Sequence, residues 1–112
     1  SNVSGGQKQM ISIARTILSD AEVLLFDDIT TSLDPDTAKL VPKLIDNLKK
    51  DHTIIMITKK PELMKTADKI VVLDHGKIND IGTHKQLIQT NEIYQMLQSR
   101  KSPSKIGVFD NV

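Results

Sequence analysis

The sequence has 112 residues, of which 38% are hydrophobic and 26% are charged, and its formal net charge is +1. This length allows one modest core, and the near-neutral charge gives no electrostatic argument for nucleic acid or acidic lipid. The absence of cysteine excludes a disulfide scaffold, and no apolar run approaches the roughly 18 residues that a membrane helix needs. We therefore expect a cytosolic domain piece whose membrane part, if there is one, lies elsewhere.

The first informative feature is a glycine-rich loop formed by Ser4, Gly5, Gly6 and Gln7. Two glycines let the backbone approach an anion closely, and a following helix points free N–H groups and its positive dipole end at that anion. The side chains of Ser4 and Gln7 add donors. The loop therefore predicts a site for phosphate oxygens, and an ordinary turn before a helix is the alternative.

A helix is expected to follow this loop from Lys8. Apolar residues recur in it at helical spacing, which predicts one inward-packing face. These residues are Met10, Ile13, Ala14, Ile17 and Leu18. We expect this packed helix to carry the glycine-rich loop.

The next feature is the apolar run Val23–Phe26, which ends abruptly in Asp27 and Asp28. Such a run is typical of a parallel strand buried on both faces, and open α/β sheets bind ligands at the carboxyl ends of their strands. Because Mg²⁺ keeps much of its hydration shell, Asp27 is predicted to hold this ion, mainly through water. A core strand that ends in a polar turn is the alternative.

A second helix is predicted to begin at Asp34 and Pro35, an N-cap residue followed by a favoured first helical residue. It is expected to run to about Lys50. Because Pro42 removes a backbone hydrogen bond and clashes with the preceding turn, we expect a kink near residues 38–39.

The following segments predict more strands. Thr53–Thr58 is again apolar enough for burial on both faces, and a short helix is expected after Pro61. Lys69–Asp74 and Lys77–Ile81 are predicted to pair as a hairpin through a two-residue turn at His75–Gly76.

Two helices are expected before the end of the chain. Thr83 and Gln86 form a T-x-x-Q capping box for the first of them, and apolar residues between 93 and 97 mark the second, which should end near Arg100. Residues 101–112 lack periodicity, so they are predicted to be a flexible tail.

In order and spacing these segments resemble the ATP-binding domain of ABC transporters of the exporter type, over about residues 3 to 100. The glycine-rich loop resembles the signature loop, and Val23–Asp28 resembles the Walker B strand. Ser32, Leu33 and Asp34 resemble the D-loop, which lies at the dimer interface in this family. The closing hairpin and the terminal helices are also similar.

The resemblance implies an α/β fold, namely part of a P-loop NTPase sheet (RecA-like, of the ABC ATPase type) with flanking helices. Residues 1–100 would be the C-terminal part of the nucleotide-binding domain, without the Walker A half. The central strand of the sheet would then be absent, which leaves two unpaired edges and a marginally stable chain. The Walker A lysine and the adenine-binding aromatic residue are also absent from this stretch, so we expect no ATP hydrolysis by the chain alone.

The resemblance also implies cofactors and partners. In the intact domain, ATP and Mg²⁺ would be bound, and Ser4 to Gln7 would contact the nucleotide held by an opposing nucleotide-binding domain. The expected partners are that second domain, in a hetero-dimer, and the transmembrane domain of the same transporter, at the cytoplasmic face of the membrane. No nucleic acid is expected.

Two positions depart from the family pattern. Asp28 stands where the family usually has the glutamate that activates water, and it is one methylene shorter. Lys59 stands at the switch-loop position, where the family has histidine, and an ammonium group offers donors but no acceptor. Since the signature loop is intact apart from Val3 in place of leucine, the pattern resembles the degenerate subunit of a heterodimeric exporter.

Two other functions are compatible with the same residues. A soluble ABC-type ATPase acting on DNA or ribosomes would share the loop and the strand, and an upstream membrane segment would argue against it. A non-catalytic interaction module is favoured by Asp28 and Lys59 but disfavoured by the preserved loop. The resemblance places the catalytic positions of the ATPase at Asp28 and Lys59.

Overall fold

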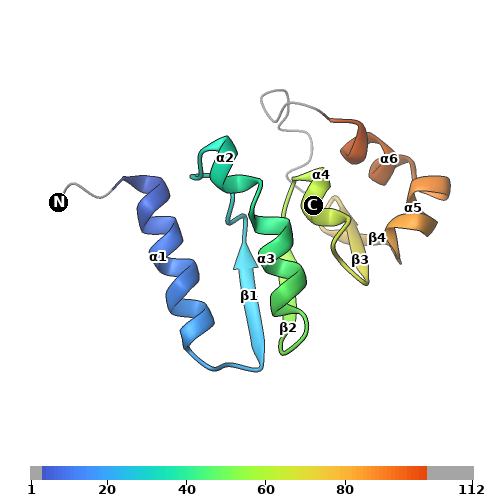
Figure 1. Cartoon of the computed structure of the whole chain (residues 1–112). Coiled ribbons are helices and arrows are strands. Elements are labelled where there is room, and N and C mark those ends of the chain that lie inside the picture. Colours follow the sequence, from blue (N-terminus) through green and yellow to red (C-terminus); the bar gives the residue numbers. More distant parts are fainter. Residues whose placement is uncertain (1–3, 101–112) are drawn as a thin grey trace. The chain divides into compact units, whose positions relative to one another are not determined.

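The structure is a computed structural model that describes residues 4–100. The chain divides into two compact units, Ser1–Ile57 and Thr58–Val112, which we call unit 1 and unit 2 and describe separately (Figure 1). Both units mix helices with strands, as the sequence predicts. The predicted tail, residues 101–112, lies outside the described residues.

The described residues of unit 1, from Ser4 to Ile57, form three helices and two strands. In chain order these are α1 (Gly5–Leu18), β1 (Val23–Asp27), α2 (Pro35–Ala38), α3 (Val41–Leu48) and β2 (Thr53–Ile57). The two strands are parallel, with Val23 opposite Thr53 and Asp27 opposite Ile57. The N–H of Asp28 extends this ladder, because it donates to the carbonyl oxygen of Ile57 at 2.8 Å.

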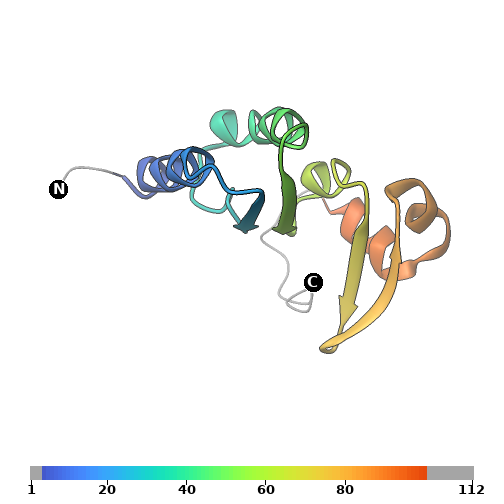
Figure 2. The ribbon, with the colours of Figure 1, turned by 90° about the horizontal axis from the view of Figure 1, so that it is seen from below.

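The expectation that both strands are buried on both faces is wrong for this chain. Leu24 and Phe26 are buried, but 62% of Leu25 and 54% of its register partner Ile55 are exposed. Figure 2 shows the reason, since α1, α2 and α3 lie on one side of β1 and β2. The opposite face of this two-stranded sheet has no cover among the described residues of unit 1.

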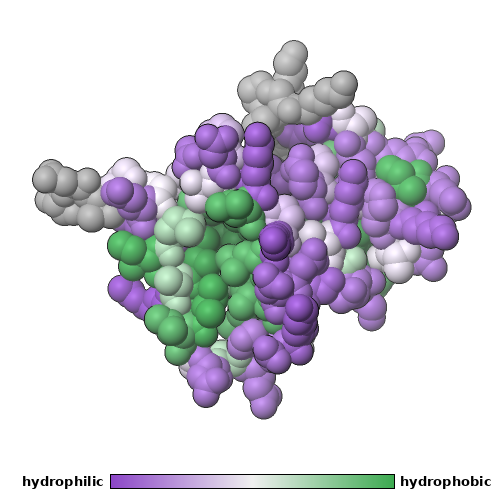
Figure 3. Space-filling view, viewed as in Figure 1, coloured by the Kyte–Doolittle hydropathy of each residue, from purple (hydrophilic) through white to green (hydrophobic). Residues whose placement is uncertain are grey.

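The helix that carries the glycine-rich loop also differs from its prediction. It begins at Gly5, three residues before Lys8, and of its predicted inward face only Ile13 is buried. Met10, Ala14 and Leu18 are exposed. Neighbouring strands are only about 4.8 Å apart, so a sheet of two strands offers only a narrow surface. This surface is too narrow to bury the whole predicted inward face of α1. Figure 3 shows hydrophobic residues gathered over α1 and between α1 and α3.

The single helix predicted from Asp34 to about Lys50 is two helices. The break falls at Lys39 and Leu40, next to the predicted kink, and α3 ends at Leu48. Pro42 lies in the first turn of α3, where its missing N–H costs no intrahelical bond. A new helix start therefore accommodates this proline better than a bend.

Unit 2 contains the predicted hairpin and three short helices. They are α4 (Pro61–Met64), β3 (Ile70–Asp74), β4 (Lys77–Gly82), α5 (His84–Thr90) and α6 (Glu92–Ser99). The strands β3 and β4 are antiparallel, and both turn residues, His75 and Gly76, have positive φ, as a two-residue turn of this type requires. The capping box of Thr83 and Gln86 is confirmed, and α6 ends next to Arg100. Between residues 4 and 100, each helix is too short or too polar to span a lipid bilayer.

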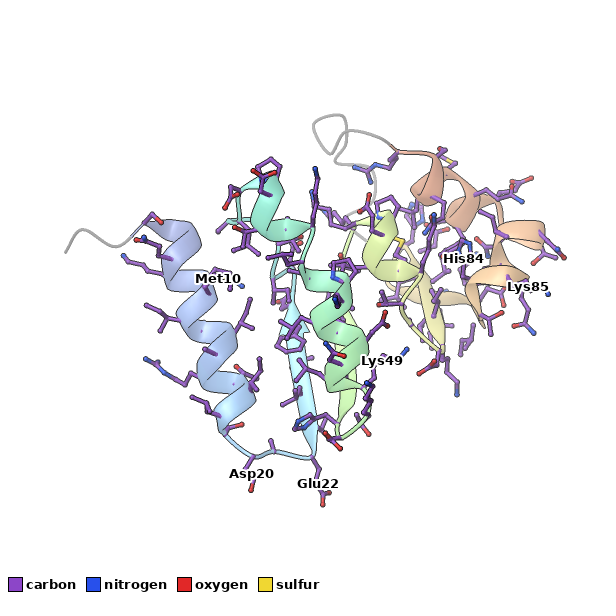
Figure 4. All side chains as sticks on the ribbon, in the orientation of Figure 1. Met10, Asp20, Glu22, Lys49, His84 and Lys85 are labelled. Carbon is purple, nitrogen blue, oxygen red and sulfur yellow. The ribbon has the colours of Figure 1, made fainter. Side chains whose placement is uncertain are left out.

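The core of unit 2 is built around Tyr94 on α6. Its side chain is fully buried and packs in a cluster with Met64, Val72, Leu87 and Leu97. Its hydroxyl group lies 2.7 Å from Nδ1 of His84, a residue labelled at the start of α5 in Figure 4, and accepts from Nε2 of Gln98 at 3.0 Å. Burial raises the pKa of the Tyr94 hydroxyl, and the bond from Gln98 acts in the opposite direction. This one side chain therefore ties α5 to α6.

Candidate functional site

The N-terminus of α1 is closed by a reciprocal capping box. The hydroxyl of Ser4 accepts from the N–H of Gln7 at 3.1 Å, and Oε1 of Gln7 accepts from the N–H of Ser4 at 2.9 Å. Two of the four predicted loop residues thus fix the start of the helix. The S-x-x-Q pattern is the same signal as the T-x-x-Q box at Thr83, so the sequence could have revealed it.

The capped terminus keeps donors for an anion. The first N–H groups of a helix have no intrahelical partner, and here these belong to Gly5 and Gly6. The Ser4 hydroxyl hydrogen and the Gln7 amide NH₂ are not consumed by the capping box, because both side chains act in it through oxygen. This donor set and the positive end of a 14-residue helix fit phosphate oxygens.

A groove of about 660 Å³ joins two of the predicted motifs within unit 1. Residues of α1 and of its N-cap form one wall, among them Met10, which Figure 4 labels, and the chain around the start of α2 forms the other. The lining residues are Ser4, Gly6, Gln7, Met10, Ile11, Leu33, Asp34 and Thr37. The structure therefore brings five predicted site residues, three from the loop and two from the predicted D-loop, to one surface.

The Asp34 side chain caps α2 at the edge of this groove. Its Oδ2 accepts from the N–H of Thr37 at 3.1 Å, and its Oδ1 accepts from the Thr37 hydroxyl at 2.6 Å. These bonds favour the carboxylate, so they lower the pKa of Asp34 below its ordinary value of 3.8. The ionised carboxylate of Asp34 therefore stabilises the start of α2 next to the predicted D-loop.

We expect the cap at Asp34 to weaken at low pH. A lowered folded-state pKa adds stability above the unfolded-state pKa, and this stability is lost as the pH falls through the folded value. The amide proton shift of Thr37 should therefore titrate below pH 3.8, as measured by NMR on the labelled chain. In Asp34→Asn this titration should vanish, while Asp36→Asn, two residues further along in the first turn of α2, should keep it. A Thr37 titration that survives in Asp34→Asn would contradict this assignment of the cap.

Asp27 is the last residue of β1, and Asp28 follows it, so both lie at the carboxyl end of this strand, as predicted. Asp27 is exposed at the end of the strand, and Asp28 has a left-handed backbone with φ of 53°. Aspartate tolerates this conformation better than most residues do. Neither residue lines the groove of the loop. No group of three or more His, Cys, Asp or Glu that could hold a metal occurs between residues 4 and 100. A single carboxylate at Asp27 still fits Mg²⁺, which is bound largely through water and nucleotide phosphates.

Lys59 belongs to unit 2, in the segment that follows β2. It is partly buried and precedes Lys60, the N-cap of α4, whose N–H donates to the hydroxyl of Thr58 at 3.0 Å. The role of Lys59 at a nucleotide stays a prediction.

Sequence reasoning missed one residue beside the predicted D-loop. Thr30 is buried, and its hydroxyl has no hydrogen-bond partner among the described residues. Its backbone carbonyl accepts from the N–H of Leu33 at 3.1 Å. Burial of a threonine between Asp28 and Asp34 carries no signal in the sequence pattern.

Comparisons with known proteins place the chain among ABC transporters. The sequence model of a family described as ABC transporter matches residues 1–31, which include the glycine-rich loop and β1. The ATP-dependent lipid A-core flippase of Haemophilus influenzae (strain 86-028NP) is 40% identical over 98 residues, which are 88% of this chain and 17% of the flippase. The pediocin PA-1 transport/processing ATP-binding protein PedD of Pediococcus acidilactici is 47% identical over 97 residues, 86% of this chain and 13% of that protein.

A solved structure extends the likeness to the fold. A bacterial Atm1-family ABC exporter with ATP bound matches with a TM-score of 0.77 and 32% sequence identity, over 84% of this chain and 17% of the exporter chain. The chain thus spans about a sixth or less of each of these proteins. Sequence and fold agree on one conclusion: the chain belongs to the ABC transporter family, as a segment of the ATP-binding domain of an exporter.

Proposed function

We propose that this chain is part of a nucleotide-binding domain that couples ATP binding and hydrolysis to transport across a membrane. The observation that carries the proposal is the groove that unites Ser4, Gly6 and Gln7 with Leu33 and Asp34. A surface that combines phosphate-facing donors with a second loop suits a nucleotide held between two domains. The relatives named as a flippase and a transport protein support the link to transport.

Within this proposal each motif has a role of its own. The N–H groups of Gly5 and Gly6, with the side chains of Ser4 and Gln7, receive phosphate oxygens of a nucleotide bound by a second nucleotide-binding domain. The segment from Ser32 to Asp34 faces that same domain. Bound Mg²⁺ would neutralise phosphate charge, and Asp27 would hold the ion on this domain's own nucleotide. The transmembrane domain of the transporter would place the whole assembly at the cytoplasmic face of the membrane.

We further propose that the nucleotide site of this domain is degenerate. Water activation needs a base within hydrogen-bond reach, and a misplacement of about 1 Å can cost on the order of 100-fold in rate. The side chain of Asp28 is one methylene shorter than that of glutamate. Its left-handed backbone conformation also fixes the direction in which this side chain leaves the main chain. Lys59 cannot accept a hydrogen bond at the switch-loop position. The partner of such a domain would be a different subunit that supplies the catalytic base.

The experiment that tests this function is a measurement of Mg²⁺-dependent ATP hydrolysis by the full-length protein, reconstituted in lipid vesicles with the proposed partner subunit. The proposal expects hydrolysis and a full-length sequence that contains a G-x-x-x-x-G-K-[ST] loop and apolar spans of about 20 residues. A hydrolysing protein without such spans would favour the soluble ATPase instead. A protein that has the fold but neither binds nor hydrolyses ATP would favour the interaction module.

In the same assay, Asp28→Asn should change the rate of hydrolysis by less than about twofold. The reason is that an amide cannot act as a base, but a degenerate site loses nothing when its base is removed. Asparagine also tolerates a left-handed backbone, so the variant should keep the φ of 53° that Asp28 has in the wild-type chain. A loss of about 100-fold would instead mean that Asp28 is a working base, and the degenerate site would be abandoned.

A further inference from the structure

The two glycines of the loop have different surroundings, although both lie in the first turn of α1. Neither has a positive φ, so the backbone conformation requires glycine at neither position. A Cβ atom added at Gly5 would meet nothing within 4 Å. A Cβ atom added at Gly6 would lie 2.8 Å from the carbonyl oxygen of Ser32. Packing therefore requires glycine at Gly6 and leaves Gly5 unconstrained.

The neighbour of Gly6 is main chain and not the end of a flexible side chain. Besides the Ser32 oxygen, the Cα atom of Leu33 would lie 3.9 Å from the added Cβ atom. This segment is braced on both sides, because the N–H of Leu33 donates to the Thr30 oxygen at 3.1 Å and the Asp34 side chain caps α2. A methyl group at Gly6 can be accommodated only if the start of α1 and the segment move apart.

We propose that Gly6 is a positioning residue that sets the spacing between the phosphate-facing start of α1 and the segment Ser32–Asp34. This inference rests on the proposed function and deepens it. The two surfaces offered to the second nucleotide-binding domain are aligned by direct contact within this chain, before that domain arrives. Gly5 and Gly6 thus serve different purposes, since Gly5 offers its N–H and Gly6 offers its N–H and also the absence of a side chain.

The expected effect of Gly6→Ala follows from the contact distance. A Cβ contact is ordinary only from 3.4 Å upward, and the available distance is 2.8 Å, so the two surfaces must separate by several tenths of an ångström. Since about 1 Å of misplacement can cost on the order of 100-fold in rate, kcat for ATP hydrolysis should fall about 10-fold to 100-fold. Because alanine favours helices more than glycine does, helix stability cannot explain such a loss.

The first experiment compares Gly6→Ala with Gly5→Ala in the full-length protein by amide hydrogen exchange. In Gly6→Ala the amide of Leu33, which is bonded to the Thr30 oxygen, should exchange about tenfold faster or more. In Gly5→Ala exchange at Leu33 should match the wild-type protein, because the added methyl group meets nothing. Unchanged exchange in Gly6→Ala, or an equal increase in both variants, would overturn the inference.

A second-site variant separates positioning from a general defect. Glycine at position 32 lets the clashing carbonyl group move at lower cost, so Gly6→Ala combined with Ser32→Gly should hydrolyse ATP at least about threefold faster than Gly6→Ala alone. A double variant no faster than the single one would contradict the positioning role.

The two measurements, ATP hydrolysis and amide hydrogen exchange at Leu33, also distinguish a failure of this inference from a failure of the proposed function. A wild-type full-length protein without ATP hydrolysis would refute the function, and hydrogen exchange would still decide the contact between Gly6 and Ser32. A hydrolysing protein in which Gly6→Ala leaves both kcat and the exchange of Leu33 unchanged would refute the positioning role alone.

Discussion

Ser4→Phe is expected to lower ATP turnover of the full-length protein by about 100-fold or more. The Ser4 hydroxyl caps α1 through the N–H of Gln7 at 3.1 Å, and the residue lines the groove. Phenylalanine cannot accept that bond, and its ring would occupy the space in front of the helix N-terminus where phosphate oxygens are proposed to lie. The loss of positioned donors for charged oxygens typically costs factors of this order. The measurement is the steady-state rate of hydrolysis with Mg²⁺ and saturating ATP.

Two further variants give this prediction its control. Ser12→Phe places the same ring on an exposed position of α1 outside the groove, and turnover should stay within about twofold of the wild type. Ser4→Thr keeps a hydroxyl cap and should retain most of the activity. If Ser4→Phe hydrolyses ATP as fast as Ser12→Phe does, Ser4 does not contact the nucleotide and the signature-loop assignment fails.

The second large effect is expected in the core of unit 2. Tyr94→Ala should lower the free energy of unfolding by about 3–5 kcal/mol, because it removes a fully buried aromatic ring and leaves a cavity among Met64, Val72 and Leu87. The groups that bond its hydroxyl, on His84 and Gln98, would also lose their partner. Since a domain of this size is stable by only a few kcal/mol, the variant should be largely unfolded in unit 2.

Urea unfolding followed by far-UV circular dichroism and by amide exchange in α5 and α6 measures this effect. Met96→Ala is the matched control, because Met96 lies on the same helix with 53% of its surface exposed, and its loss should be within about 0.5 kcal/mol. Tyr94→Phe keeps the ring and should lose only about 1 kcal/mol or slightly more, which isolates the hydrogen bonds. Equal stability of Tyr94→Ala and Met96→Ala would show that the Tyr94 cluster is not the core.

Local signals were sufficient for most of the secondary structure. The hairpin turn at His75–Gly76 and the capping box at Thr83 each depend on a few neighbouring residues, and each occurs where it was predicted. The predicted kink near residues 38–39 is instead a break between two helices at Lys39 and Leu40. The boundaries differ by one to three residues, most at α1, because its S-x-x-Q cap was overlooked. Local patterns predict these features well because the hydrogen bonds concerned join residues close in sequence.

Burial was predicted less well. The apolar runs in β1 and β2 indicate two covered faces, but Leu25 and Ile55 are exposed. A hydrophobic pattern predicts which faces of a strand are favourable to bury. It does not show whether the helix or strand that would pack on such a face belongs to the same chain. The same reason explains why most of the predicted inward face of α1 is exposed.

The sequence by itself determined the family, the order of the elements and the residues at which anion and metal chemistry is proposed, because glycines, caps and strand-terminal carboxylates are local features. Only the tertiary structure decided that Ser4, Gly6 and Gln7 share a groove with Leu33 and Asp34, and that Gly6 lies against the carbonyl group of Ser32. These contacts join segments about 26 residues apart, and their distance depends on how α1 packs beside the loop after β1. A sequence pattern contains no such distance, so the separate reasons for the two adjacent glycines become visible only in the folded chain.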